Sequence, residues 1–254
     1  MLGEITTTIK VQAVVYRDSI PWGIQDDLNI QLFNDSEADV ILFPGWSFRD
    51  TNHVENFKIS ISNNITLGFL ELQRVDSRDL TNALFSISKG ELKFVSIQLF
   101  STSNEIATNP VLGQMFVDQF ANARAFKVKN KIVRIMQCGE LNILRNEQAN
   151  GNKVEFRFLD KSLEIQFLKS LQETALILNP QHTPMGNQGK MSRRRAYLSS
   201  NRRGYISTSN VSTGQELEKT KSAHYAYFNG RELERNTVDK GEFHRVYEYD
   251  LNCG

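Results

Sequence analysis

Short apolar runs recur along the chain, and polar stretches that contain glycine or proline separate them. Runs of this length, rich in β-branched and aromatic residues, are typical of strands. The pattern predicts strands at residues 9–16, 39–43, 65–72, 83–87, 92–100, 123–128, 132–135, 174–178, 204–210, 223–228 and 246–250. Lys-Gly between the fourth and fifth runs is typical of a hairpin turn.

Apolar positions at helical spacing predict helices between some of these strands. Residues 26–38 and 54–64 are candidates, and residues 163–173 have an amphipathic pattern. Residues 101–110 and 146–153 are polar, and we predict that they form loops. A strand, a helix and a strand in succession indicate right-handed crossovers and therefore an α/β fold.

The composition is that of an ordinary globular protein. The chain has 254 residues, of which 40% are hydrophobic and 23% charged, and its formal net charge is +1. We find no linker and no repeat, so we expect a single domain over residues 1–254. The near-neutral charge gives no support for nucleic-acid binding, and no apolar run reaches the roughly 20 residues of a membrane helix. The N-terminus lacks the basic and apolar segments of a signal peptide.

Two cysteines, Cys138 and Cys253, make no disulfide framework and predict a reducing, cytoplasmic setting. We expect Cys253, beside the C-terminus, to be poorly ordered. Histidine, cysteine and acidic residues show no metal-ligand spacing, and a glycine-rich phosphate loop is missing. The sequence therefore predicts neither a metal nor a cofactor.

Cys138 follows the predicted strand 132–135 and precedes Gly139. A cysteine at a strand end, followed by a glycine that permits a sharp turn, can present its sulfur in a pocket. The alternative is a buried, inert cysteine that acts as a small apolar side chain.

Four segments resemble, in order, the motifs of the nitrilase or carbon–nitrogen hydrolase superfamily across nearly the whole chain. Residues 38–44 resemble a buried strand that ends in Phe-Pro, and residues 80–100 resemble a hairpin that ends in Leu-Phe. Residues 133–140 resemble the nucleophile motif, and residues 175–184 with 201–210 resemble the stretch that closes the pocket. The resemblance implies an α-β-β-α sandwich of two mixed β-sheets flanked by helices, assembled as a homodimer.

Members of this family hydrolyse amide or nitrile C–N bonds through a thioester, using a cysteine nucleophile, a glutamate base and a lysine that stabilises the oxyanion. The resemblance places the nucleophile at Cys138, but it places Gly45 at the glutamate position and Ser96 at the lysine position. Loss of an oxyanion donor costs about 10²–10³ in rate, and loss of a general acid or base costs roughly 10²–10⁴. We therefore do not expect ordinary amidase turnover.

Other charged side chains could replace the two lost groups. Glu140 follows the cysteine closely, Glu105 lies after Leu-Phe, and Glu71 ends a predicted strand. Each of these glutamates is also explained as a solvated or structurally paired carboxylate. Lys93 shares a predicted strand with Ser96, but it lies three residues away and therefore on the opposite face.

The segment Asn-Pro-Gln-His-Thr-Pro supplies candidate ligand-binding residues. His182 could line the pocket and polarise a ligand, with Gln181 and Trp46 beside it, or it could simply hydrogen-bond within its loop. The arginines at 193–195 and 202–203 predict a solvated helix face, with an anionic ligand or acidic partner as the alternative.

Three functions are consistent with these residues. The first is a pseudoenzyme that keeps Cys138 and binds a small amide-like ligand or a protein partner. The second is an active thiol-dependent amide hydrolase that uses a non-standard base such as Glu140 or Glu105. The third is a structural subunit whose pocket is filled by its own Trp46 and Phe48.

Overall fold

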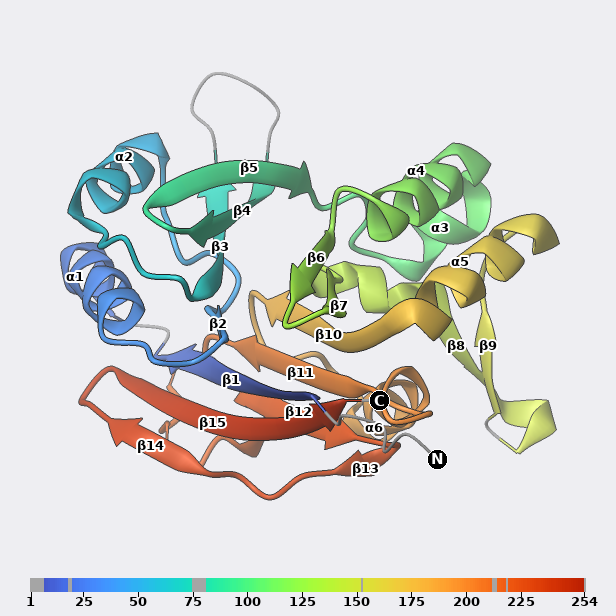
Figure 1. The fold of residues 1–254 in the computed structure, drawn as a ribbon. Helices are drawn as coiled ribbons and strands as arrows, with labels where there is room; N and C mark the ends of the chain where they lie inside the picture. Colours follow the sequence, from blue (N-terminus) through green and yellow to red (C-terminus); the bar gives the residue numbers. More distant parts are fainter. Residues whose placement is uncertain are drawn as a thin grey trace, which may run out of the picture.

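Two large mixed β-sheets form the centre of the molecule (Figure 1). The structure is a computed structural model, and it describes residues 7–17, 20–74, 81–151, 153–211, 214–217 and 219–253. The N-terminal segment in which we predict no signal peptide, residues 1–6, lies outside the described residues, as does position 80 of the hairpin motif.

The first sheet has seven strands. In chain order they span Thr7–Tyr16 (β1), Val40–Leu42 (β2), Leu67–Arg74 (β3), Thr81–Ser88 (β4), Glu91–Ile97 (β5), Thr237–Lys240 (β14) and His244–Cys253 (β15). Their order across the sheet is β14, β15, β1, β2, β3, β4, β5. The strands β1, β2 and β3 run parallel, whereas β15 and β4 pair antiparallel with their neighbours. Parallel strands in this order require the two crossover connections that the sequence predicts.

The second sheet has six strands. They span Ala125–Val128 (β6), Lys131–Ile135 (β7), Thr174–Gln181 (β10), Gly204–Ser209 (β11), His224–Phe228 (β12) and Arg231–Glu232 (β13). Their order is β13, β12, β11, β10, β7, β6, and β10 runs parallel to both of its neighbours. A separate hairpin consists of Leu144–Glu147 (β8) and Lys153–Phe156 (β9).

The two sheets pack face to face around one apolar cluster. Alternate residues of β1, such as Ile9, Val11 and Ala13, lie in this cluster together with Val133 and Ile135 of β7. The period of two follows from strand geometry, because successive side chains point to opposite faces of a sheet. The alternation in residues 9–16 therefore identifies the face of β1 that meets the second sheet.

Helices cover the outer face of each sheet. They span Trp22–Asn34 (α1), Thr51–Ser60 (α2), Ser103–Thr108 (α3), Pro110–Ala121 (α4), Lys161–Glu173 (α5) and Gln188–Leu198 (α6). Separate apolar clusters join α1 and α2 to the first sheet and α4, α5 and α6 to the second. Figure 1 shows α1 and α2 at one end of the molecule and α3, α4 and α5 at the other. The α-β-β-α sandwich that we predicted is confirmed.

The chain between residues 101 and 122 is more helical than the sequence pattern predicts. We predicted a loop at residues 101–110, but α3 forms there with a capping box between Thr102 and Glu105. Asn109 then caps α4, whose first residue is Pro110. The side chains at these two helix starts satisfy backbone N–H groups, and a search for apolar periodicity alone does not detect them.

Two further expectations about local structure are wrong. Residues 146–153 contribute to the β8–β9 hairpin and are not wholly a loop. Cys253 is fully buried in β15, where it pairs with Thr7, and burial raises the pKa of its thiol to about 11. Among the described residues, no helix is long and apolar enough to cross a membrane.

Candidate active site

Two pairs of parallel strands bring the candidate residues to one end of the sandwich. These pairs are β2 and β3 in the first sheet and β7 and β10 in the second. Gly45 lies just beyond β2, and Glu71 lies on the adjacent β3. Cys138 and His182 follow β7 and β10, which run parallel with Ile135 opposite Leu178. The Gly45 backbone N–H donates to the Gln181 carbonyl at 2.9 Å and so joins the two sheets at this end.

Cys138 is the first residue of a short 3₁₀ helix, Cys138–Ile143 (η1), that begins directly after β7. Its side chain is partly exposed, in contrast to the fully buried Cys253. Gly139 is required beside it, because a Cβ there would lie 2.4 Å from the Cα of Ser101. Gly139 therefore serves close packing against Ser101 beside a partly exposed cysteine, and the prediction that the sulfur opens into a pocket stays a prediction.

His182 forms the centre of a three-residue chain of contacts. Its Nε2 hydrogen-bonds Oε1 of Glu71, and its ring is within hydrogen-bond reach of the Cys138 thiol. The Glu71 side chain is fully buried, whereas that of His182 keeps 11% exposure. Burial by itself lowers the pKa of His182, but the charge of Glu71 and the hydrogen bond to Cys138 outweigh it and raise the pKa to about 10. His182 is therefore an imidazolium at neutral pH, held between a carboxylate and a thiol.

Gly45 makes the position of His182 possible. A Cβ at residue 45 would lie 2.5 Å from Cδ2 of His182 and 2.9 Å from the His182 backbone nitrogen. Any side chain at residue 45, a glutamate included, is thus incompatible with the imidazole where it stands. Gly45, which the sequence resemblance matches to the glutamate position, thus leaves the space that the His182 imidazole occupies.

Trp46 covers the other side of the imidazole. The two rings stack with centroids 4.2 Å apart and planes 10° from parallel. Trp46 has φ of 61°, in the left-handed region, and its indole Nε1 donates to Oδ1 of Asn82 at 2.8 Å. An aromatic face is a favourable neighbour for an imidazolium. Phe48 is fully buried against α2 and faces away from this stack, toward the outer cluster of the first sheet.

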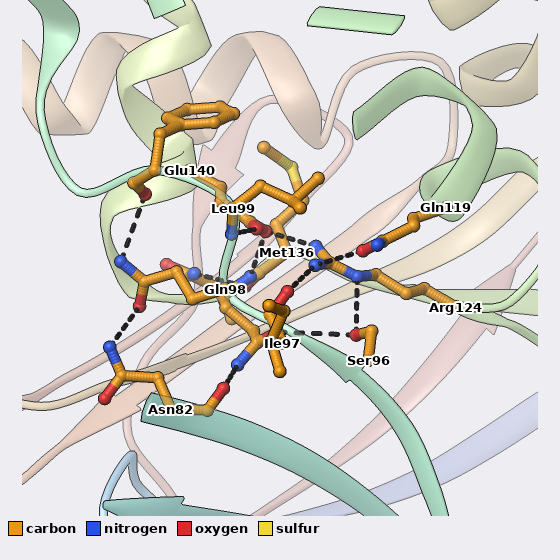
Figure 2. Close-up of polar contacts among 12 residues, drawn as sticks. Asn82, Ser96, Ile97, Gln98, Leu99, Gln119, Arg124, Met136 and Glu140 are labelled. Atoms are coloured by element: carbon orange, nitrogen blue, oxygen red, sulfur yellow. Dashed lines mark hydrogen bonds and ion pairs between the residues drawn. The ribbon is translucent and has the colours of Figure 1, made fainter. Parts of the chain in front are cut away.

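Ser96, which the sequence resemblance matches to the lysine position, is buried and contacts the guanidinium of Arg124. Its hydroxyl accepts a hydrogen bond from Nε of Arg124 at 2.9 Å. Arg124 also forms an ion pair with Glu140, and both side chains are fully buried. Figure 2 shows the guanidinium between Ser96, Ile97, Gln119 and Glu140.

The glutamates that we considered as substitute bases have other contacts. Glu140 accepts from Arg124 and from the backbone N–H groups of Leu99 and Gln137, so both carboxylate oxygens are engaged. Glu105 caps α3, and hydrogen bonds from the backbone of Thr102 and Ser101 lower its pKa. The Cys138 thiol contributes to the raised pKa of His182, and it is therefore the imidazole that we consider as its partner.

Further candidates make contacts within the protein. Lys93 is exposed and forms an ion pair with Glu91 at 2.6 Å. Gln181 is buried and donates to Oδ1 of Asn179 at 2.6 Å. The prediction of a solvated arginine face is wrong for three of its five members, since Arg194, Arg195 and Arg203 are buried.

Sequence reasoning missed Arg124 and Gln137 altogether. Arg124 lies between α4 and β6, in a part of the sequence with no recognisable motif, and Gln137 is an uncharged residue in a segment where Cys138 and Glu140 are the residues that suggest chemistry. Glu71 carries one usable signal, because it is an acidic residue between the apolar side chains of Leu70 and Leu72. A buried carboxylate of that kind requires a partner. Within the described part of the chain, no group of three histidine, cysteine or acidic side chains could hold a metal ion.

Comparison with solved structures identifies the fold. A glutamine-dependent NAD(+) synthetase from Cytophaga hutchinsonii superposes with a TM-score of 0.59 and 12% identity, over 96% of this chain and 43% of the synthetase chain. A mutant of the amidase from Nesterenkonia sp. AN1 gives 0.58 and 10%, over 96% and 90%. A carbon–nitrogen hydrolase from Helicobacter pylori G27 gives 0.56 and 12%, over 97% and 90%. No protein-family model and no curated protein sequence matches the chain.

The chain therefore has the nitrilase-like fold of the carbon–nitrogen hydrolase superfamily. It spans less than half of the synthetase chain but nine-tenths of the amidase and of the hydrolase. At these identities the likeness concerns the fold. A homodimer, a small amide-like ligand or a protein partner, and a cytoplasmic location stay predictions.

Proposed function

We propose that the protein is a thiol-dependent hydrolase of non-peptide C–N bonds, in which Cys138 is the nucleophile and His182, held by Glu71, transfers the protons. One observation supports this proposal: an imidazolium anchored on the buried carboxylate of Glu71 lies beside Cys138, the residue that the sequence resemblance matches to the nucleophile. A thiol, a histidine and an orienting third group are the elements of an activated cysteine nucleophile.

Cys138 and His182 each act in both halves of the reaction, the formation of the thioester and its hydrolysis. The Cys138 sulfur attacks the amide carbon as a thiolate, a form that a hydrogen-bonded imidazolium stabilises. His182 gives its proton to the leaving amine as the C–N bond breaks, and a thioester remains on Cys138. The now neutral His182 accepts a proton from water, which attacks the thioester, releases the acid and returns the thiolate–imidazolium pair. Because Nε2 is held by Glu71, we assign the proton exchange to Nδ1.

Stabilisation of the oxyanion is the function that this site supplies least well. Ser96 supplies no ammonium, and its hydroxyl is engaged between Arg124 and Gln137. Loss of one oxyanion donor lowers the rate by about 10²–10³, so we expect slow turnover compared with an enzyme that has the lysine. This observation supports a second candidate, a pseudoenzyme that binds an amide-like ligand or a protein partner at the same thiol without releasing product.

Alkylation of Cys138, which reports the nucleophile, and ammonia release, which reports turnover, together test the first proposal and separate it from the second. The Nesterenkonia amidase takes up the acetamide moiety of fluoroacetamide at its active-site cysteine, so the probes are fluoroacetamide and a series of short aliphatic amides. We expect the Cys138 sulfur to displace fluoride from fluoroacetamide and to keep the acetamide moiety, the aliphatic amides to release ammonia, and Cys138→Ala to lose both reactions. Mass spectrometry locates the adduct, and the buried Cys253 serves as an internal reference thiol.

Histidine variants show whether His182 is the active group. His182→Ala is expected to slow adduct formation at about pH 7 by roughly 10²-fold or more. His53→Ala is the matched control, because His53 also pairs with an aspartate, Asp26, but lies on α2. Adduct formation without ammonia release supports the pseudoenzyme. Equal reactivity of the wild type and His182→Ala contradicts the proposed role of His182.

A further inference from the structure

A buried chain of polar side chains lies behind the candidate active site, and the mechanism above does not use it. It runs from Arg124 through Ser96 and Gln137 to Glu71, whose carboxylate holds His182. Each of these four side chains belongs to a residue that is at most 4% exposed. Buried polar groups are costly unless their hydrogen bonds are satisfied, so a continuous buried chain indicates a specific arrangement.

Arg124 forms the fixed end of this chain. Its Nη2 donates to the Ile97 carbonyl and to Oε1 of Gln119, both at 2.7 Å, while Nη1 pairs with Glu140. Its Nε donates to Ser96 at 2.9 Å (Figure 2). Four of the five N–H groups of the guanidinium are thereby used, and its charge is balanced by a carboxylate. Ser96 Oγ is therefore an acceptor towards Arg124 and can donate only in the other direction.

Gln137 links this fixed end to the site. Its Nε2 donates to Oε2 of Glu71 at 2.9 Å and to the Asn82 carbonyl at 2.8 Å, and its Oε1 accepts from Ser96 at 3.4 Å. The orientation of the amide is fixed, because two acceptors lie on one side and a hydroxyl donor lies on the other. With Oε2 of Glu71 held by Gln137, Oε1 is left for His182.

We propose that Gln137 is a positioning residue of the active site, which orients the Glu71 carboxylate towards His182 and is itself held in place by Ser96 and Arg124. This inference rests on the proposed function, because it requires that His182 activate Cys138. In this arrangement Arg124 acts at the Ser96 position through hydrogen bonds, not as a catalytic cation. Partners of this kind set the orientation of the group that does the chemistry.

The test is the alkylation rate of Cys138 by iodoacetamide from about pH 5 to about pH 9, a range in which a histidine-paired thiolate differs from an ordinary thiol. Gln137→Met removes the donor to Glu71 at similar length. We expect alkylation near neutral pH to slow about tenfold, the value of one hydrogen bond to a charged group. Gln12→Met is the matched control, because Gln12 also donates to a glutamate, Glu248 at 3.0 Å, and accepts from a serine, Ser36. It is expected to leave the profile unchanged.

Gln137→Glu separates a positioning role from a merely structural one, because only a positioning role makes the effect on the alkylation rate depend on pH. The new carboxyl group lies against Glu71 and can donate a hydrogen bond to it only while protonated. We expect alkylation close to the wild-type rate at the acidic end of the profile and close to the Gln137→Met rate at the alkaline end. A profile parallel to the wild type across the whole range overturns the inference, and this result can be obtained even if Gln137→Met does not fold.

His182→Ala distinguishes failure of the positioning role of Gln137 from failure of the proposed function. If His182→Ala slows alkylation and Gln137→Met does not, the positioning role is wrong and the proposed function stands. If neither variant slows alkylation, the proposed function fails as well. Arg124→Lys is expected to slow alkylation several-fold, whereas Arg134→Lys is not, since the buried Arg134 donates mainly to backbone carbonyls beneath α4 and α5. If Arg124→Lys and Arg134→Lys affect alkylation equally, Arg124 has no specific role in positioning Gln137.

Discussion

Gly45→Ala is the smallest change that probes the relation between the lost glutamate position and His182. The added methyl group would lie 2.5 Å from Cδ2 of His182 and 2.9 Å from two backbone atoms, the Gln181 carbonyl carbon and the His182 nitrogen. Contacts this short cannot persist, so the imidazole or the Gln181–His182 backbone has to move. The backbone is tied to Gly45 by the 2.9 Å hydrogen bond from its N–H to Gln181, which leaves the ring as the more mobile part.

Two magnitudes follow from this displacement. Overpacking of a tightly packed site costs about 1–3 kcal/mol of unfolding free energy. A shift of about 1 Å in a catalytic group costs up to roughly 10²-fold in rate. We therefore expect Gly45→Ala to lower the free energy of unfolding by about 2 kcal/mol and to slow Cys138 alkylation near neutral pH by more than tenfold.

Urea denaturation measures the first effect, and alkylation by iodoacetamide measures the second. Gly23→Ala is the control, because Gly23 lies in α1 with no atom within 4 Å of an added Cβ. An alanine there is expected to stabilise the helix by up to about 1 kcal/mol and to leave alkylation unchanged. Wild-type alkylation in Gly45→Ala would refute the reasoning, since it would mean that His182 does not depend on the space beside Gly45.

Two further predictions concern charge. The pKa of His182 is raised from 6.5 to about 10 in the folded protein, so its stabilising contribution is complete below about pH 6.5 and is lost as the pH rises to about 10. The unfolding free energy of wild type minus that of His182→Gln, measured by urea titration at several pH values, should fall over this window by about 5 kcal/mol at most, and a difference that is constant or rises with pH contradicts the assigned protonation. Ser96→Lys should lower the unfolding free energy by about 3 kcal/mol or more, because it puts an ammonium beside the guanidinium of Arg124 at a buried site. It should not increase amide hydrolysis. A gain in ammonia release with unchanged stability would contradict this prediction and show that the site accepts a lysine.

The sequence predicts the sheets well because their signals are local. Alternation in residues 9–16 and the apolar run of β10 depend only on which side chains face a core, and both strands form where the pattern predicts them. The hairpin of β4 and β5 depends on Lys89 and Gly90, which adopt φ of 54° and 71°. Such a turn favours Gly at its second position, and this preference is visible in the sequence.

The site is predicted only in part, because its contacts join distant segments. Cys138, Gly45 and Ser96 could be found from short motifs, each beside a recognisable strand end. The partner of His182 could not, since Glu71 precedes it by 111 positions and nothing near either residue indicates the pair. Arg124 was missed for a similar reason, because its partner Glu140 was considered as a base for the thiol and not as its counter-ion.

Two pairs of buried charges, Glu71 with His182 and Arg124 with Glu140, depend on the small residues Gly45 and Ser96. Glu71 is fully buried among apolar strands, and a buried carboxylate that loses its cation costs about 3–5 kcal/mol. His182 supplies that cation only if residue 45 has no side chain. Arg124 occupies the second position only if residue 96 is small and can accept its Nε–H. In each case a small residue and a buried ion pair are two parts of one packing arrangement. A glutamate placed at residue 45 alone would therefore displace His182 and leave Glu71 without its counter-ion, so Gly45→Glu is expected to be less stable and less reactive than the present chain.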